Sequence, residues 1–164
     1  MWNNKKFEKS VLICVIRGAK KSEIINQTMR GIRNNNPLNI RRSKDQWKGA
    51  ATTQTDKEFV QFKSKAYGYR AAWRTLHTYY KRLSDRNKHF TVENIIGRWA
   101  PPTENNTQNY IDFVCKKLGA AASYEVEQTE TEYIALLQAM CIMEIGCQPY
   151  EDSIWEKAAN MANL

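Results

Sequence analysis

The 164-residue sequence predicts a mainly helical domain of the α+β class. Four stretches, at about residues 66–83, 91–99, 107–118 and 131–145, repeat apolar side chains at the three- and four-residue spacing of a helix. Between the first of these and an Asn-rich run, residues 47–63 are instead rich in Thr, Val and Phe, which favour extended backbone. The length is typical of one domain, so we expect residues 30–164 to form it after a variable leader, residues 1–29.

The predicted helices are bounded by residues that start and stop helices. Thr91 can cap the short helix that ends before Pro101. Thr107 can cap the next one, which stops at Gly119. The helix of residues 131–145 ends at Gly146 and is followed by a further helical stretch that contains Ile154, Trp155 and Ala158.

Residues 47–63 are predicted to form a small, irregular β-hairpin. Phe59 and Phe62 depart from the strict alternation of a strand, so the hairpin is expected to be irregular. We expect it to interrupt an otherwise helical domain.

The composition limits the classes of partner. The net charge of +8 favours a polyanion, which could be nucleic acid, an anionic cell wall or acidic lipid. The basic residues are scattered and match no nucleic-acid-binding motif, which makes nucleic acid the third choice. No segment approaches the roughly 20 apolar residues of a membrane span, and the apolar run of residues 11–16 is too short for a signal peptide, so we expect no classical export signal.

The cysteines and histidines do not predict a metal or cofactor site. Their spacing matches no ligand set, and buried free thiols are the simpler interpretation. The residues concerned are Cys14, Cys115, Cys141, Cys147, His77 and His89.

Glu144 is the first candidate catalytic residue. It follows Leu137, Met140 and Cys141 by seven, four and three residues, so helical periodicity places its carboxyl on an apolar face. Burial there would raise the carboxyl pKa, as a general acid for glycosidic cleavage requires. The alternative is a glutamate that reaches solvent at a helix end.

A second candidate site is the loop of residues 99–111. Glu104 is the second catalytic candidate, and Trp99, Asn106 and Tyr110 are candidates for binding substrate. Alternatively, Glu104 only stabilises the positive end of the following helix. Asp56 is a weaker third carboxylate candidate.

The Asn-rich run of residues 30–41, RGIRNNNPLNIR, is interpreted as a carbohydrate-facing loop. Asn side chains both donate and accept hydrogen bonds, and the nearby Trp47 offers a flat apolar face to a sugar ring. The candidates for binding substrate are Asn36, Asn39, Arg41 and Trp47. An ordinary Asn-rich turn is the alternative.

Several segments together carry a family resemblance. Residues 30–41, 47–49, 56–62, 68–71 and 98–107 resemble phage and prophage virion structural proteins related to a phage lytic endopeptidase with a lysozyme-like fold. More distantly, residues 39–41, 47–49, 62–64 and 79–80 are similar to flagellar and autolysin glucosaminidases. The resemblance implies a lysozyme-like helical domain, peptidoglycan as the substrate, and Arg70 as a further substrate-binding residue.

The position of the acid departs from the glucosaminidase pattern. There the catalytic Glu lies in a Glu-Ser-Gly helix end upstream of the Asn segment, whereas here residues 139–146, AMCIMEIG, resemble that helix end and come last. We therefore hypothesise a circularly permuted order. It predicts that Glu144 faces a groove lined by Asn36, Asn39, Trp47 and Tyr110.

The sequence thus favours a phage-type bacteriolytic hydrolase or lytic transglycosylase that acts on peptidoglycan and needs no cofactor. It would be made in the bacterial cytoplasm and act in the periplasm, at the cell wall or from a virion, with other virion or secretion components as further partners. The resemblance also allows an endopeptidase, although no zinc set, Cys–His pair or Ser triad is evident in the sequence. The alternatives are a non-catalytic virion or wall-binding protein and, third, a basic nucleic-acid-binding module.

Overall fold

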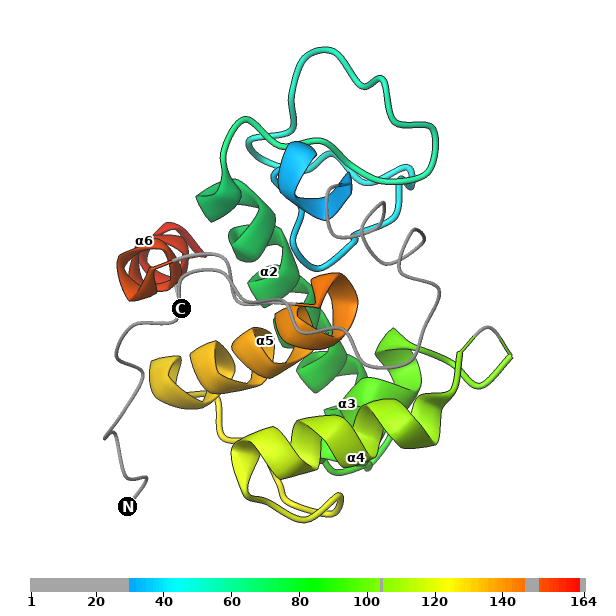
Figure 1. The fold of residues 1–164 in the computed structure, drawn as a ribbon. Helices are drawn as coiled ribbons and strands as arrows, with labels where there is room; N and C mark the ends of the chain where they lie inside the picture. Colours follow the sequence, from blue (N-terminus) through cyan, green and yellow to red (C-terminus); the bar gives the residue numbers. More distant parts are fainter. Residues whose placement is uncertain (1–29, 104, 147–150, 163–164) are drawn as a thin grey trace.

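The computed structural model describes residues 30–103, 105–146 and 151–162. This part of the chain is mainly helical, as predicted. Residues 30–33 are helical, and the later helices are α2 (Lys65–Ser84), α3 (Val92–Trp99), α4 (Thr107–Leu118), α5 (Glu130–Ile145) and α6 (Asp152–Ala162) (Figure 1). No helix in the described part has the length and apolar character needed to cross a membrane. The predicted leader lies outside the described residues.

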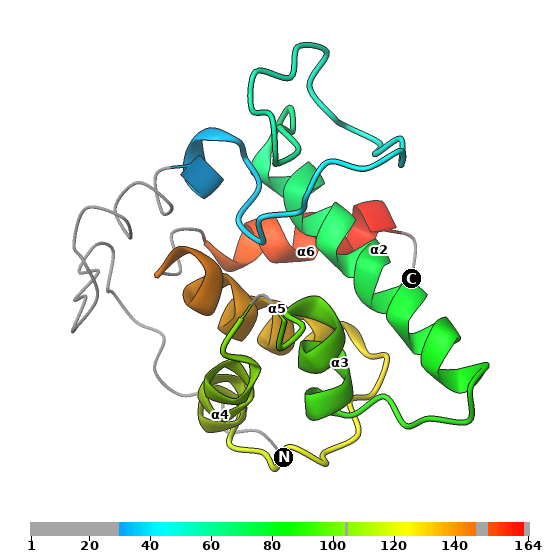
Figure 2. The same cartoon turned by 90° about the vertical axis from the view of Figure 1, so that its right-hand side faces the viewer.

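The helices are arranged around α2, the longest of them. α6 packs along α2, and α4 packs against both α3 and α5. Figure 2 shows α3 on the near side of the molecule and α6 behind α2, while the loop before α2 covers the opposite end from α3 and α4. The fold therefore has a loop-rich end and a helical end, joined by α2.

Large aromatic side chains from α2, α5 and α6 form the centre of the core. Trp73 and Tyr69 of α2, Tyr133 of α5 and Trp155 of α6 are almost fully buried. The rings of Tyr69 and Trp155 approach to 3.5 Å between centroids, and those of Trp73 and Tyr133 to 5.3 Å. Full burial of one large apolar side chain contributes about 1.5–3 kcal/mol, so these contacts are a main reason why α5 and α6 pack on α2.

The helix boundaries agree with most of the predicted caps. The Thr91 side chain accepts a hydrogen bond from the Asn94 amide at the start of α3. Gly119 and Gly146 end α4 and α5 in the left-handed conformation. The predicted cap at Thr107 is wrong, because the preceding Asn106 side chain caps α4.

The predicted β-hairpin is also wrong: the described residues contain no β-strand, and residues 41–62 make only two isolated antiparallel bridges, Arg41 with Phe59 and Ala50 with Phe62. Side-chain oxygens accept hydrogen bonds from several backbone N–H groups that would otherwise pair between the strands of a hairpin. Asp56 Oδ1 accepts from the amides of Glu58 and Phe59, and Gln54 Oε1 accepts from the amide of Gln61. The segment is therefore a loop stabilised by its own side chains.

Two glycines allow the Asn-rich turn to pack closely between α2 and the end of α5. A Cβ atom on Gly68 of α2 would lie 2.1 Å from the Asn35 carbonyl oxygen, and one on Gly31 would lie 2.7 Å from Cγ2 of Ile145. Asn35 and Asn39 have positive φ angles of 50° and 48°, which Asn tolerates better than most residues. The turn of residues 34–39 is thereby fixed against the helix end that carries Glu144.

Substitution of Gly68 by Ala should test this close approach. The added methyl group meets a backbone oxygen, so we expect Gly68→Ala to lower the free energy of unfolding by about 1–3 kcal/mol in urea denaturation. Gly97→Ala in α3 is the matched control, because no atom lies within 4 Å of its added Cβ. It should stabilise the protein by about 0.5–1 kcal/mol. Equal effects of the two substitutions would contradict the packing described.

Candidate active site

The Glu144 carboxylate is held by side chains from three separate segments. Trp99 Nε1 donates to Oε1 at 2.9 Å, and the Tyr110 hydroxyl donates to the same oxygen at 3.1 Å. Asn39 Nδ2 donates to Oε2 at 3.2 Å. The carboxyl group is partly buried in the last turn of α5. It is therefore oriented by three neutral donors.

The pKa of Glu144 is raised above the usual value of a glutamate. Burial is the main cause, because it disfavours the charged carboxylate. The hydrogen bonds from Trp99, Asn39 and Tyr110 and the charge of Arg41 act in the opposite direction and lower the pKa. The net result is a carboxyl group that keeps its proton to a higher pH than an exposed glutamate.

Each donor is positioned by the element that carries it. Trp99 is the last residue of α3 and packs edge-on against Tyr79 of α2, with 6.3 Å between ring centroids. Tyr110 lies in the first turn of α4 and is buried. Asn39 ends the turn of residues 34–39, which the close contacts at Gly31 and Gly68 hold in place.

The other residues of the predicted groove lie apart from the carboxylate. Asn36 is fully buried, and its side chain bonds the backbone of Ile40 and Val60, so it holds the loop together. Trp47 packs partly buried against the core, and its indole N–H has no hydrogen-bond partner. Of the four residues predicted to line the groove, Asn39 and Tyr110 contact Glu144.

The remaining candidates have varied surroundings. Arg41 is exposed and lies over the Phe59 ring, 5.6 Å from its centroid. Arg70 donates to the carbonyl of Met161 and so ties α2 to the end of α6. Asn106 caps α4. Glu104 lies outside the described residues.

No family model matches the chain. The chain is 41% identical over 129 residues to "Protein P5" of Pseudoalteromonas phage PM2, and the aligned part covers 77% of each protein. It belongs to the family of this phage protein. The phage part of the sequence resemblance is therefore confirmed.

In this member of the P5 family, Asp56 is part of a buried ionic network. Arg30 donates to both of its carboxylate oxygens at 2.6 Å, and Asn34 donates a third hydrogen bond at 2.8 Å. The Arg30 guanidinium holds the pKa of Asp56 well below its usual range. This carboxylate is ionised and fully engaged, which makes it a poor general base.

Two surface hollows lie beside the network and beside α4. The first, of about 580 Å³, includes Arg30, Asn34 and Asp56, and the second, of about 660 Å³, extends from Pro102 to Ile111. Glu144 lines neither of them. Trp99 and Tyr110, which hydrogen-bond the Glu144 carboxyl group, line neither hollow.

The described residues offer no metal site, because they contain no group of three or more His, Cys, Asp or Glu side chains suited to one. Cys115 is a free thiol, and Cys141 is buried with its sulfur 3.5 Å from the Tyr69 hydroxyl. Burial raises the pKa of Cys115. Cys14 and Cys147 lie outside the described residues.

Sequence reasoning named Trp99 and Tyr110 as substrate-binding residues and missed that both donate to Glu144. It also missed the pairing of Arg30 with Asp56, which are 26 residues apart. The sequence around a Trp or a Tyr does not reveal which group its indole N–H or hydroxyl will hydrogen-bond. Buried polar groups are usually hydrogen-bonded, so a Glu predicted to be buried could have prompted a search of the sequence for donor side chains.

Replacement of Glu144 by Gln should stabilise the protein in a pH-dependent way. Because the folded-state pKa is raised, wild type loses stability as the pH rises from the unfolded-state pKa through the folded-state pKa. Glu144→Gln has no such loss, so its free energy of unfolding relative to wild type should increase between pH 4 and pH 7. Urea denaturation at several pH values measures this. A difference independent of pH would show that the carboxyl is not perturbed.

Replacement of Asp56 by Asn should have the opposite pH dependence. A carboxyl group with a lowered folded-state pKa stabilises the protein at pH values above its unfolded-state pKa. This stabilisation is lost as the pH falls toward the folded-state pKa. We expect Asp56→Asn to cost about 1–3 kcal/mol at pH 7, the range for hydrogen bonds to charged groups, and less below pH of about 4. Asp112→Asn on exposed α4 is the control and should be nearly neutral. An equal cost at all pH values would contradict the ionic role.

Proposed function

We propose that this protein cleaves the glycan strands of peptidoglycan, with Glu144 as the general acid. The observation that carries the proposal is the Glu144 carboxyl group, which has a raised pKa and is oriented by Asn39, Trp99 and Tyr110. Glycosidic cleavage needs a carboxyl group that is still protonated when the substrate binds. The membership in a phage family and the positive net charge agree with an anionic cell-wall substrate.

The hydrogen bonds indicate which oxygen carries the proton. The Trp99 indole can only donate, so Oε1 must accept there, and the Tyr110 hydroxyl donates to the same oxygen. Oε2 accepts only the longer hydrogen bond from Asn39, and a protonated carboxyl oxygen can still accept a hydrogen bond beside its own O–H. The acidic proton therefore belongs on Oε2, which would give it to the glycosidic oxygen.

The reaction best supported is that of a lytic transglycosylase. In the described part of the chain, the side chains that hydrogen-bond the Glu144 carboxyl group are Asn39, Trp99 and Tyr110, and Asp56 is engaged with Arg30. In such a reaction, Glu144 protonates the leaving oxygen as the glycosidic bond breaks. Its carboxylate then takes the proton from a hydroxyl of the same sugar, which attacks the cationic carbon and closes an anhydro ring without consuming water.

A lysozyme-like fold in permuted order is part of the proposal. Its support is that Asn39 and Glu144, which are 105 residues apart, meet with the acid-bearing helix end last in sequence. In the glucosaminidases that the sequence distantly resembles, the catalytic Glu precedes the Asn segment in the chain. This protein and the glucosaminidases would then share the pairing of an Asn with the acidic Glu and differ in the order of the two along the chain.

The first test is product analysis. Wild type and Glu144→Gln are incubated with isolated peptidoglycan, and the soluble fragments are identified by mass spectrometry. Wild type should release anhydro-sugar fragments, and Glu144→Gln should lose at least about 100-fold in rate, the lower end for an acid–base residue. Glu130→Gln, at the exposed start of the same helix, is the matched control and should retain activity.

Each other outcome has a definite meaning. Reducing sugars from wild type would show hydrolysis and direct attention to a second carboxylate, with Glu104 the candidate. Free peptide ends would identify an endopeptidase. Full turnover by Glu144→Gln, or fragments from neither protein, would refute Glu144 catalysis and favour the non-catalytic virion or wall-binding role.

A Trp99→Phe substitution should shift the pH profile of the reaction. Activity requires the protonated acid, so it falls as the pH rises through the Glu144 pKa. Loss of the indole N–H removes a donor that stabilises the carboxylate, which raises the pKa further and moves the alkaline limb to higher pH. Trp47→Phe is the control, because its indole N–H has no partner. An alkaline limb at the same pH in Trp99→Phe and wild type would contradict the assignment.

A further inference from the structure

Two arginines, Arg82 and Arg98, lie near Tyr79, whose ring packs against Trp99 of the Glu144 site. Arg98 of α3 lies over the Tyr79 ring, with its guanidinium carbon 4.9 Å from the centroid. Arg82 of α2 is three residues after Tyr79, which places it on the same helix face. Burial raises the pKa of Tyr79, and the charges of Arg98 and Arg82 act against this, in agreement with their closeness.

Arg98 is connected to the proposed acid through two aromatic side chains. The Tyr79 ring packs edge-on against Trp99, and Trp99 donates to Glu144. Figure 2 shows α3 and the C-terminal half of α2 on one side of the molecule. Tyr79 and Trp99 thus lie between Arg98 and Glu144, and Arg82 shares the helix face of Tyr79.

Both arginines have their charge available. They are exposed, and neither forms an ion pair with a carboxylate of the described residues. α2 contains basic residues and no Asp or Glu at all. The stacking on Tyr79 also restricts the Arg98 side chain, so less freedom would be lost when it binds an anion.

We propose that Arg82 and Arg98 bind a carboxylate carried by the glycan, so that the substrate is a strand with acidic substituents on its sugars and not a neutral amino-sugar polymer. The inference rests on the proposed function. The carboxylate could belong to the lactyl group of muramic acid or to the stem peptide. Both present the planar anion that a guanidinium fork binds through two parallel hydrogen bonds.

The test is a set of binding titrations by calorimetry on the full chain. Its probes are a neutral N-acetylglucosamine tetramer, a muramic-acid disaccharide with a free lactyl carboxylate, and the disaccharide bearing a tetrapeptide. Wild type should bind at least one acidic probe several-fold more tightly than the neutral one. In the double variant Arg82→Gln/Arg98→Gln, the ratio of affinities for the acidic and the neutral probe should fall by about 3- to 10-fold, as expected for the loss of two exposed ion pairs. Raised salt should lower the same ratio in wild type.

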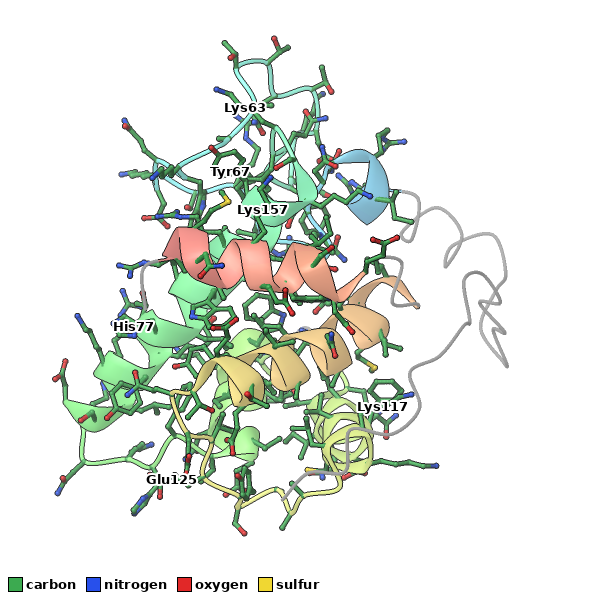
Figure 3. All side chains as sticks on the ribbon, turned by 90° about the vertical axis from the view of Figure 1, so that its left-hand side faces the viewer. Lys63, Tyr67, His77, Lys117, Glu125 and Lys157 are labelled. Atoms are coloured by element: carbon green, nitrogen blue, oxygen red, sulfur yellow. The ribbon has the colours of Figure 1, made fainter. Side chains whose placement is uncertain are left out.

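The control variant also removes two positive charges, but at positions away from Tyr79. Lys63→Gln/Lys157→Gln changes exposed lysines that are labelled in Figure 3 and lie away from α3, and it should retain the preference. The probe that loses affinity identifies the source of the carboxylate. An unchanged preference in the arginine variant, an equal loss in the control, or no preference in wild type would overturn the proposal.

Failure of the proposed function would look different. If wild type releases no fragments from peptidoglycan but binds acidic probes through Arg82 and Arg98, the arginine site stands and the enzyme does not. If wild type cuts peptidoglycan and the arginine variant keeps its preference, the enzyme stands and the arginine site does not. Binding and product analysis together therefore separate the two claims.

Discussion

The arrangement around Glu144 depends on placing a carboxyl group where burial opposes its charge while three neutral donors fix its direction. The donors come from residues 39, 99 and 110, which belong to a turn, the end of α3 and the start of α4. Each segment must be held in position independently. The site is therefore as much a property of the packing of α2, α3, α4 and the Asn-rich turn as of the glutamate itself.

The surroundings of Asp56 and Glu144 shift the pKa values of the two carboxyl groups in opposite directions. Asp56 accepts hydrogen bonds from a guanidinium and is fixed as an anion, so it supports the loop of residues 41–62. Glu144 accepts from neutral groups while partly buried, so it retains its proton more readily. This difference in neighbours separates a structural carboxylate from one suited to acid catalysis.

The sequence predicted the parts of the fold that are set by local patterns. Helical apolar spacing located α2 to α5, and the glycines at 119 and 146 ended two of them as expected. The hairpin prediction failed because it used the extended-backbone preference of Thr and Phe. It could not foresee that Asp56, Gln54 and Gln61 would take the backbone hydrogen bonds. These bonds join residues two to seven positions apart, and no periodicity of apolar residues signals them.

The same distinction applies to the site. Glu144 was named as a candidate because its apolar neighbours lie on its own helix, and Asn39 and Tyr110 were named from residue chemistry. That Asn36 would face inward while Asn39 faces Glu144 depends on a turn with positive φ angles at Asn35 and Asn39, which no periodicity predicts.

The central claim is that Glu144 holds a proton above the usual range of glutamates, and NMR titration of carboxyl carbons in glutamate-labelled protein tests it most directly. The Glu144 resonance is assigned by its absence in Glu144→Gln. Because burial raises its pKa, this carboxyl group should titrate above the ordinary glutamate value of about 4.3. Titration at or below that value would show that the three donors outweigh burial. Glu144 would then be an anion near neutral pH and would have no proton to donate.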